Sequence, residues 1–196
     1  MSAQFVAHAL SYILGKGSIS LKGPKKRPWL EIARSEIDRR YLSHQLRLLK
    51  EHHDGAFEFY RDRIATDGFY DKERFRFQGD NLWRVYELIY PKDKKRLSRE
   101  VLNIAGLKGA AALWIDQGRV IGKQGSIRGR YSEHDYGELE SWFNDLGIPT
   151  KILRNQISII HLSFKKDSLN ELRQLIRPLV HINMRKTLQQ RISNFR

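Results

Sequence analysis

Two apolar stretches end in polar residues that could take part in phosphate chemistry, each directly before a glycine. Lys16 ends AHALSYILGKG before its last glycine, and Asp116 and Gln117 end GAAALWIDQG in the same place. A carboxylate such as that of Asp116 is a hard oxygen ligand that can hold Mg²⁺ against a phosphate. The ammonium of Lys16 repels a metal ion but neutralises a phosphate. The amide of Gln117 is neutral and supplies no charge to a metal.

Basic side chains recur along several stretches that alternate with a period of two. In ERFRFQ (73–78) the phenylalanines fall on one face of a strand and the arginines on the other, because successive side chains alternate. Such charges often only solvate a face, but an arginine-bearing sheet can also lie in a major groove and match guanine edges and phosphates. The residues predicted to contact nucleic acid are Lys22, Lys25, Lys26 and Arg27 on a first hairpin, Arg74, Arg76, Arg128 and Arg130 on two strands, and Lys151 and Arg154 on a later strand.

These residues must be positioned by elements that follow one order twice: helix, strand, strand, helix, strand, strand, helix. Hydrophobic periodicity and Gly/Pro breaks predict helices over 4–14, 36–53, 81–90, 107–117, 133–146 and 168–179, with a terminal helix over 188–195. They predict strands over 18–22, 28–34, 56–64, 73–78, 119–123, 126–131, 151–154 and 156–164. Ser35 and Asp80 are predicted to cap the second and third helices, and Asn155 to form a turn.

The fold class predicted from this order is α+β, a duplicated αββαββα arrangement with two antiparallel sheets. Strands in adjacent pairs argue against an alternating parallel sheet. The repeat is too long for a solenoid and indicates two pseudo-symmetric halves, 1–97 and 98–196, that share one core. Small residues on the two glycine-ended helices would let those helices pack closely.

Composition points to a polyanionic partner. The chain has 36 Lys and Arg against 22 Asp and Glu, a net charge of +14, which favours nucleic acid. It has no cysteine, so it contains neither a disulfide framework nor a thiolate zinc site. Its seven histidines look scattered, and no metal site is expected from them. No apolar run reaches the roughly 18 residues of a membrane span, so we expect no membrane partner.

At the two glycine-ended stretches the chain resembles the LAGLIDADG homing endonucleases, in the branch that carries one motif copy in each half of a single chain. The resemblance extends over nearly all 196 residues. It implies that the two helices cross at a pseudo-twofold axis, that the sheets form a saddle for nucleic acid, and that each helix end carries a metal-binding acid. At those positions this chain has Lys16 and Gln117. The resemblance also implies a basic residue near each acid, by position Lys95 and Lys186.

The leading hypothesis is a monomeric nucleic-acid-binding protein without cleavage activity or cofactor, acting on structured RNA or duplex DNA. By resemblance its role would be that of an intron RNA maturase or a ribonucleoprotein component, in an organelle (mitochondrion or chloroplast) or the bacterial cytoplasm. The alternative is a site-specific homing endonuclease or nickase that uses Asp116 and Mg²⁺, or another carboxylate such as Asp135. A third hypothesis is a structural subunit whose basic face is buried against RNA.

Overall fold

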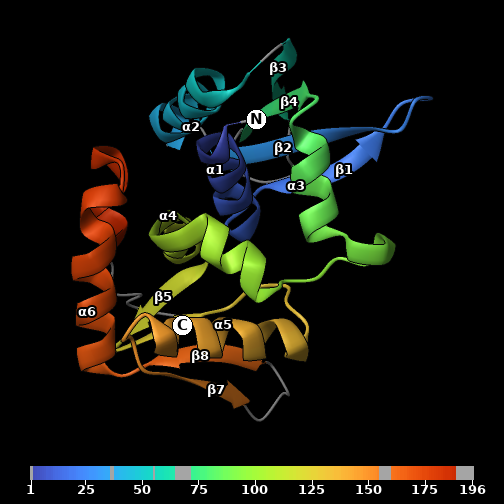
Figure 1. Cartoon of the computed structure of the whole chain (residues 1–196). Coiled ribbons are helices and arrows are strands. Elements are labelled where there is room, and N and C mark those ends of the chain that lie inside the picture. Colours follow the sequence, from blue (N-terminus) through green and yellow to red (C-terminus); the bar gives the residue numbers. More distant parts are fainter. Residues whose placement is uncertain (1, 36–37, 55, 65–71, 155–159, 189–196) are drawn as a thin grey trace.

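The chain folds into two four-stranded antiparallel sheets on either side of two central helices, α1 (Ala3–Leu14) and α4 (Arg99–Gln117) (Figure 1). The computed structural model describes residues 2–35, 38–54, 56–64, 72–154 and 160–188. The strand order is β1-β2-β4-β3 in the first sheet and β5-β6-β8-β7 in the second. The predicted α+β class and the duplication are therefore confirmed. The boundary between 1–97 and 98–196 stays a prediction.

The elements follow the predicted order, with most boundaries shifted by a few residues. The first half continues with β1 (Ser18–Lys22), β2 (Arg27–Ser35), α2 (Arg39–His52), β3 (Phe57–Ile64), β4 (Lys72–Gly79) and α3 (Leu82–Ile89), followed by the short η2 (Pro91–Asp93). After α4 come β5 (Gly118–Ile121), β6 (Gln124–Ile127), α5 (Glu133–Asp145), β7 (Thr150–Arg154), β8 (Ile160–Phe164), α6 (Lys166–Ile176), η3 (Arg177–Leu179) and η4 (Ile182–Leu188).

Small residues let α1 and α4 pack directly against each other. Gly109 lies so close to α1 that a Cβ there would stand 2.9 Å from Cδ1 of Leu14, and a Cβ on Gly15 would collide with the Asp116 carboxylate. The core of the molecule is continuous through this contact, since the same buried cluster includes Phe5 and Phe77 from the first half and Trp114 from the second. The close helix crossing therefore sets the positions of both sheets.

The second central helix is longer than predicted because it contains a kink. α4 begins at Arg99, where the Ser98 hydroxyl accepts a hydrogen bond from the Val101 amide at 3.3 Å. Gly106 has φ 53° and ψ −153°, a conformation that residues with a Cβ rarely adopt. The predicted start at residue 107 thus marks the kink, and the helical segment before it, from Arg99, was missed.

Three predicted boundaries are wrong. Ser35 does not cap α2, because it is the last residue of β2 and pairs with Lys72. Asp80 does not cap α3, whose N-cap residue is Asn81. The strand predicted over 126–131 ends at Ile127, because beyond it the Gly129 amide donates to the hydroxyl of Tyr136 at 3.0 Å instead of to a neighbouring strand. The Asn155 turn, and the terminal helix beyond residue 188, lie outside the described residues.

Histidines that look scattered in the sequence meet on one side of the central helices. His8 of α1 stacks on His52 of α2 with ring centroids 5.2 Å apart, and His44 lies 4.7 Å from His181. Burial, then the positive charge of Lys108 and the neighbouring His52, lower the pKa of His8 to about 4, and Glu51 opposes this shift only weakly. In the described part of the chain no three metal-ligating side chains come together at a metal-binding spacing, and no helix is long and apolar enough to cross a membrane.

The lowered pKa of His8 predicts that acid weakens the fold. Unfolded His8 takes up a proton near its ordinary pKa of 6.5, whereas the folded side chain does so only near 4. Between these values the unfolded state binds more protons, so the free energy of unfolding should fall as the pH drops and stay constant above this window. Urea unfolding from about pH 7 to about pH 5 measures this. His8→Gln should reduce this slope, and the remainder is assigned to His44 and His181, whose pKa values burial also lowers. The same change at exposed His134 should leave the slope unchanged, and an undiminished slope in the His8 variant would contradict the assignment.

Candidate nucleic-acid interface

The tips of the two central helices lie side by side, as expected. The backbone amide of Lys16 donates to Oδ2 of Asp116 at 3.0 Å. In return Nε2 of Gln117 donates to the carbonyl oxygens of Gly15 at 2.7 Å and Leu14 at 3.0 Å. The two side chains at the end of α4 thus both bind backbone atoms at the end of α1, and the polar residues singled out from the sequence are in one place.

Asp116 is held by an arginine that sequence reasoning did not identify. Nη1 of Arg34, from β2, donates to Oδ1 of Asp116 at 2.6 Å, and Nη2 donates to Oδ2 at 3.0 Å. Each of these side chains is only 1 % exposed. Burial disfavours the charge of Arg34, but the adjacent carboxylate outweighs it and raises the pKa of the guanidinium. Both oxygens of Asp116 are therefore engaged and shielded from solvent.

Arg34 is fixed independently of Asp116. Its Nε donates to Oε1 of Gln45 at 2.8 Å, and its guanidinium carbon lies 4.4 Å from the ring centre of Tyr41. The sequence contains a signal for this residue: in the β2 strand PWLEIAR, Arg34 falls in the alternation of Leu30 and Ile32, which face the core. A charge at a core position requires a buried partner of opposite charge.

The side chain of Gln117 links the ends of the two helices through hydrogen bonds. The hydroxyl of Tyr131 donates to the Leu14 carbonyl at 2.6 Å and lies 3.0 Å from Nε2 of Gln117. The amide nitrogen therefore faces oxygen atoms. A carboxylate in its place would meet the carbonyl oxygens of Leu14 and Gly15, which would repel it. Tyr131, predicted to be the end of a strand, instead belongs to this tip cluster.

The other residues considered for catalysis are not joined to the tips. Lys95 lies in the connection that leads into α4, and Lys186 in η4; both are exposed. Within the described residues neither forms a hydrogen bond or ion pair with Asp116 or Gln117. Asp135 is a helix cap, because it accepts from the Ser132 amide at 3.0 Å and from the Leu97 amide at 2.8 Å. The side chain of Lys16 is exposed beside the tips.

On the first sheet the predicted arginines lie on the face away from the helices. Phe75 and Phe77 are fully buried, whereas Arg74 and Arg76 alternate with them on the solvent side. The strand register brings Asp62 opposite Arg74, on the same face. By the same register Lys22 and Arg27, which pair with each other, also belong to this side.

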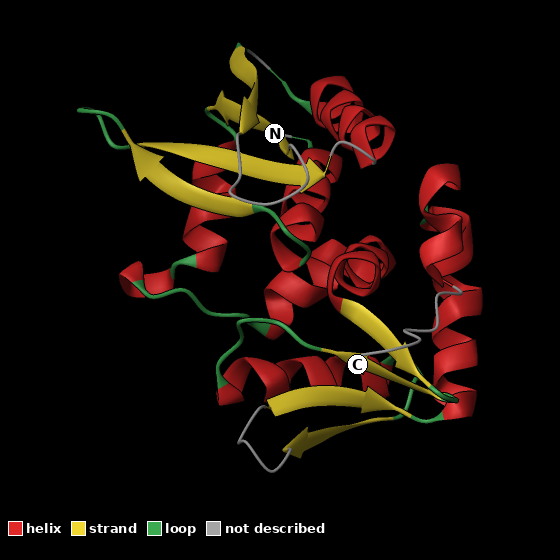
Figure 2. Cartoon of the chain, turned by 180° about the vertical axis from the view of Figure 1, so that it is seen from behind, coloured by secondary structure: helices red, strands yellow, loops and turns green. Residues whose placement is uncertain are grey.

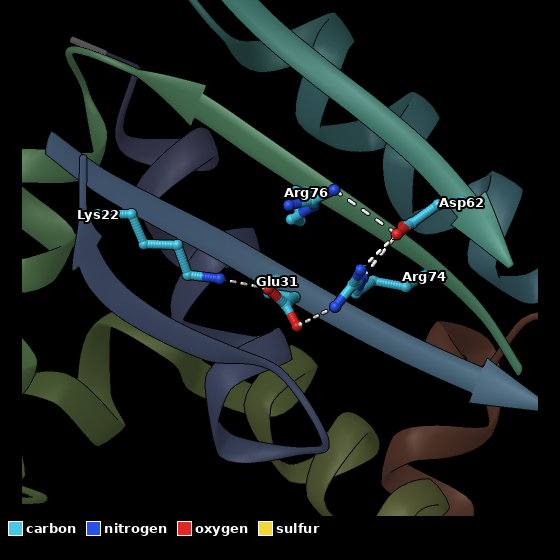
Figure 3. A network of polar contacts seen from close by, with 5 residues as sticks. All are labelled: Lys22, Glu31, Asp62, Arg74 and Arg76. Atoms are coloured by element: carbon cyan, nitrogen blue, oxygen red, sulfur yellow. Dashed lines mark hydrogen bonds and ion pairs between the residues drawn. The ribbon is translucent and has the colours of Figure 1, made fainter. Parts of the chain in front are cut away.

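Carboxylates link these cations into a network across the sheet (Figure 3). Lys22 Nζ lies 2.7 Å from Oε2 of Glu31, and Nη1 of Arg74 lies 3.2 Å from Oε1 of the same residue. Asp62 accepts from Nε of Arg74 at 3.0 Å and also from its Nη2, and lies 3.5 Å from Nη2 of Arg76. The hydrogen bond from Arg74 lowers the pKa of Asp62. Unused N–H groups of Arg74 remain on its terminal nitrogens, the pair of donors that matches the O6 and N7 acceptors of guanine.

This network predicts that Asp62 restrains non-specific binding. In Asp62→Asn one negative charge is lost and Arg74 becomes available to any phosphate, so affinity for duplexes of unrelated sequence should rise a few-fold. Discrimination between a selected sequence and a scrambled one should fall by about tenfold, the worth of one bidentate base contact. Fluorescence anisotropy with both duplexes measures this. Glu87→Gln, the same charge change at an exposed position of α3, is the control. Equal effects of the two variants would show that only net charge matters.

On the second sheet the two predicted cations of β7 lie on opposite faces. Arg154 pairs with Ile160 on the helix-covered side and forms an ion pair with Glu133 of α5. Lys151, three positions earlier on β7, lies on the opposite face beside Ser163, because an odd separation along a strand reverses the face. Arg119 shares that solvent side and was missed, although it precedes the buried Val120 in the sequence.

The remaining predicted cations lie around the sheets. Lys25 and Lys26 form the turn between β1 and β2, where Lys26 has φ 47°, and Figure 2 shows this hairpin reaching beyond the rest of the chain. Arg128 follows β6 and is half-buried, with its amide bonded to the Gln117 carbonyl at 3.3 Å. Arg130 is exposed in the following loop. Apart from Arg154, the predicted cations thus surround the outer faces of the sheets and the helix tips; their contact with nucleic acid stays a prediction.

Two glycine-ended helices that cross between two four-stranded sheets define a fold class, that of the LAGLIDADG homing endonucleases. Comparison with solved structures shows this fold over nearly the whole chain. The homing endonuclease I-WcaI, bound to its DNA recognition sequence, matches with a TM-score of 0.75 and 14 % identity over 96 % of this chain and 88 % of that one. Mesophilic variants of I-DmoI match with a TM-score of 0.63 and 13 % identity over 91 % and 97 %.

The same fold is found in a protein whose description names no endonuclease. The N-terminal LAGLIDADG domain of DUF199/WhiA matches with a TM-score of 0.55 and 11 % identity, over 93 % of this chain and 86 % of that one. At the level of sequence, neither a protein family nor a curated protein matches the chain. On this scaffold both I-WcaI and I-DmoI are found in complex with DNA.

Proposed function

We propose that this protein binds nucleic acid across the outer faces of its two sheets and does not cleave it. The observation that carries the proposal is the buried pair of Arg34 and Asp116, whose side chains are each 1 % exposed. Metal-assisted cleavage needs carboxylate oxygens that face the phosphate and the ion. Here the carboxylate at the helix tips is bound by a guanidinium and a backbone amide.

The residues at the tips do not fit Mg²⁺. A metal at Asp116 would have to displace Arg34 from both oxygens and would leave that guanidinium charged and buried without its partner. Gln117 presents its amide nitrogen to the carbonyls of the other helix. The exposed ammonium of Lys16 repels a cation and suits a phosphate. These contacts argue against the alternative of a homing endonuclease or nickase that uses Asp116.

The binding proposal rests on charge and its placement. The net charge is +14, and the predicted cations other than Arg154 lie around the sheet faces and the tips. I-WcaI is bound to DNA on the same scaffold, so duplex DNA is one ligand class. Structured RNA is the other, and a monomer that serves intron RNA maturation or a ribonucleoprotein needs binding without cutting. We therefore favour a maturase-like or ribonucleoprotein role.

The salt dependence of binding tests this function. Sequencing the nucleic acid that co-purifies with the protein gives the ligand, and affinity is then measured against salt for that ligand and for a duplex. A steep slope indicates several released counterions. Arg74→Ala and Arg128→Ala should each weaken binding. If neither variant changes affinity at low salt, or if the wild type binds no nucleic acid, the proposal fails.

A further inference from the structure

The solvent face of the first sheet carries two aromatic rings next to the charge network. Trp29 of β2 and Tyr60 of β3 pack with ring centroids 5.6 Å apart and planes inclined by 31°. Tyr60 remains 50 % exposed. The register brings Gln78 between the two strands, opposite both Trp29 and Glu58. The sheet thus presents ring faces and polar side chains together.

A hollow of about 380 Å³ opens beside this pair, between Trp29 and the first hairpin. Trp29 lines it together with Gln78 and Glu58. Its other side is cationic and comes from the hairpin, with Lys25 and Arg27. The hollow therefore combines a surface for stacking, groups that can hydrogen-bond a base edge, and positive charges for the adjoining phosphates.

A closed duplex cannot use this combination. In a major groove the bases are stacked on one another and offer only their edges, so a ring face finds no partner. Unstacked bases of loops, bulges and single strands do stack on aromatic side chains, with cations following the backbone. The second sheet has no matching pair of Trp and Tyr rings: where the structure describes it, the corresponding face carries Arg119 and Lys151, the apolar Ile121 and Leu153, and the single ring of His161. Because this site occurs in one half of the chain, it fits a single unpaired nucleotide.

We infer that the hollow between Trp29, Gln78 and the first hairpin holds an unpaired nucleobase, with its flanking phosphates on Lys25 and Arg27. This inference rests on the proposed function and narrows its ligand class to nucleic acid with an unpaired segment, as in RNA loops or a single strand. The carboxylate of Glu58 favours a base with an exocyclic amino group.

The test compares paired and unpaired forms of one sequence. Short fluorescein-labelled RNA and DNA strands without internal pairing are titrated with the protein, alone and annealed to their complements. Trp29→Ala should weaken single-strand binding by about tenfold and duplex binding by less than about twofold, since each stacked base contributes substantially. Tyr60→Ala, a change at a half-exposed position, should act in the same direction, and Trp29→Phe should retain most of the affinity.

Trp83→Ala is the matched control, because Trp83 is also partly exposed, at 41 %, but lies on α3. The inference is overturned if Trp29→Ala and Tyr60→Ala leave single-strand affinity unchanged, or if they weaken duplex binding as much. Stronger binding of the RNA strand than of the DNA strand would identify RNA as the source of the base. A wild type that binds neither form refutes the proposed function itself, whereas wild-type binding with no effect of the aromatic variants refutes only the inference.

Discussion

Arg34→Ala is expected to lower the free energy of unfolding by about 3–5 kcal/mol, because it leaves the buried Asp116 without its partner. This loss of stability is larger than the loss expected from breaking an ordinary surface ion pair, because both side chains are buried. Urea denaturation followed by tryptophan fluorescence gives this quantity. The variant should also be the least stable of the single substitutions considered for this protein.

Two further variants test whether the loss of stability comes from breaking the buried ion pair. Arg34→Met combined with Asp116→Leu removes both charges and should recover most of the lost stability, as is common for buried pairs replaced by apolar residues. Arg47→Ala removes an exposed pair with Glu51 and should cost less than about 1 kcal/mol. If Arg34→Ala lowered the free energy of unfolding as little as Arg47→Ala does, Asp116 would not depend on Arg34 as a buried partner.

Charge reversal at the first hairpin is expected to give the largest loss of binding. Lys25 and Lys26 form an exposed turn that extends from the body of the chain, so Lys25→Glu with Lys26→Glu should leave the fold intact (Figure 2). Affinity for a duplex should fall by more than about tenfold. The slope of log K against log salt should become shallower by about 2, because each phosphate that a lysine neutralises releases about 0.9 counterion.

The control for the hairpin variant carries the same charge change elsewhere. This control combines Arg40→Glu with Arg47→Glu. Both residues belong to α2, which packs on the opposite side of the same sheet. This double variant should change affinity only slightly and should leave the slope nearly unaltered. If both double variants reduce binding equally, the protein binds through its net charge and not through the hairpin.

The local sequence pattern was sufficient to predict the position of a side chain where its neighbours along the chain determine whether it is buried or exposed. Arg74 and Arg76 alternate with buried phenylalanines on β4, so their solvent face followed from the period of two. Lys151 and Arg154 were grouped together because their stretch is short and has no such alternation. The register then shows that they lie on opposite faces. The order of helices and strands was predictable for the same reason, because each element carries its own period.

Contacts between distant parts of the chain were not predictable. Arg34 and Asp116 are brought together only when β2 and α4 pack on α1, and no local period relates them. The same holds for the network of Glu31, Arg74 and Asp62, whose members come from three strands. The helical segment before Gly106 was missed because a glycine can mark either a helix end or a kink. Only the backbone conformation of Gly106 separates these two possibilities.

Cleavage of a bound target tests the central claim most directly. Duplex DNA and structured RNA that the protein selects from randomised pools are incubated with excess protein and Mg²⁺ or Mn²⁺, and strand integrity is followed on denaturing gels. With Asp116 engaged by Arg34 and the amide nitrogen of Gln117 bound to the carbonyls at the end of α1, the strands should remain bound and intact. Metal-dependent breaks at a fixed position that disappear in Asp116→Asn would contradict the account.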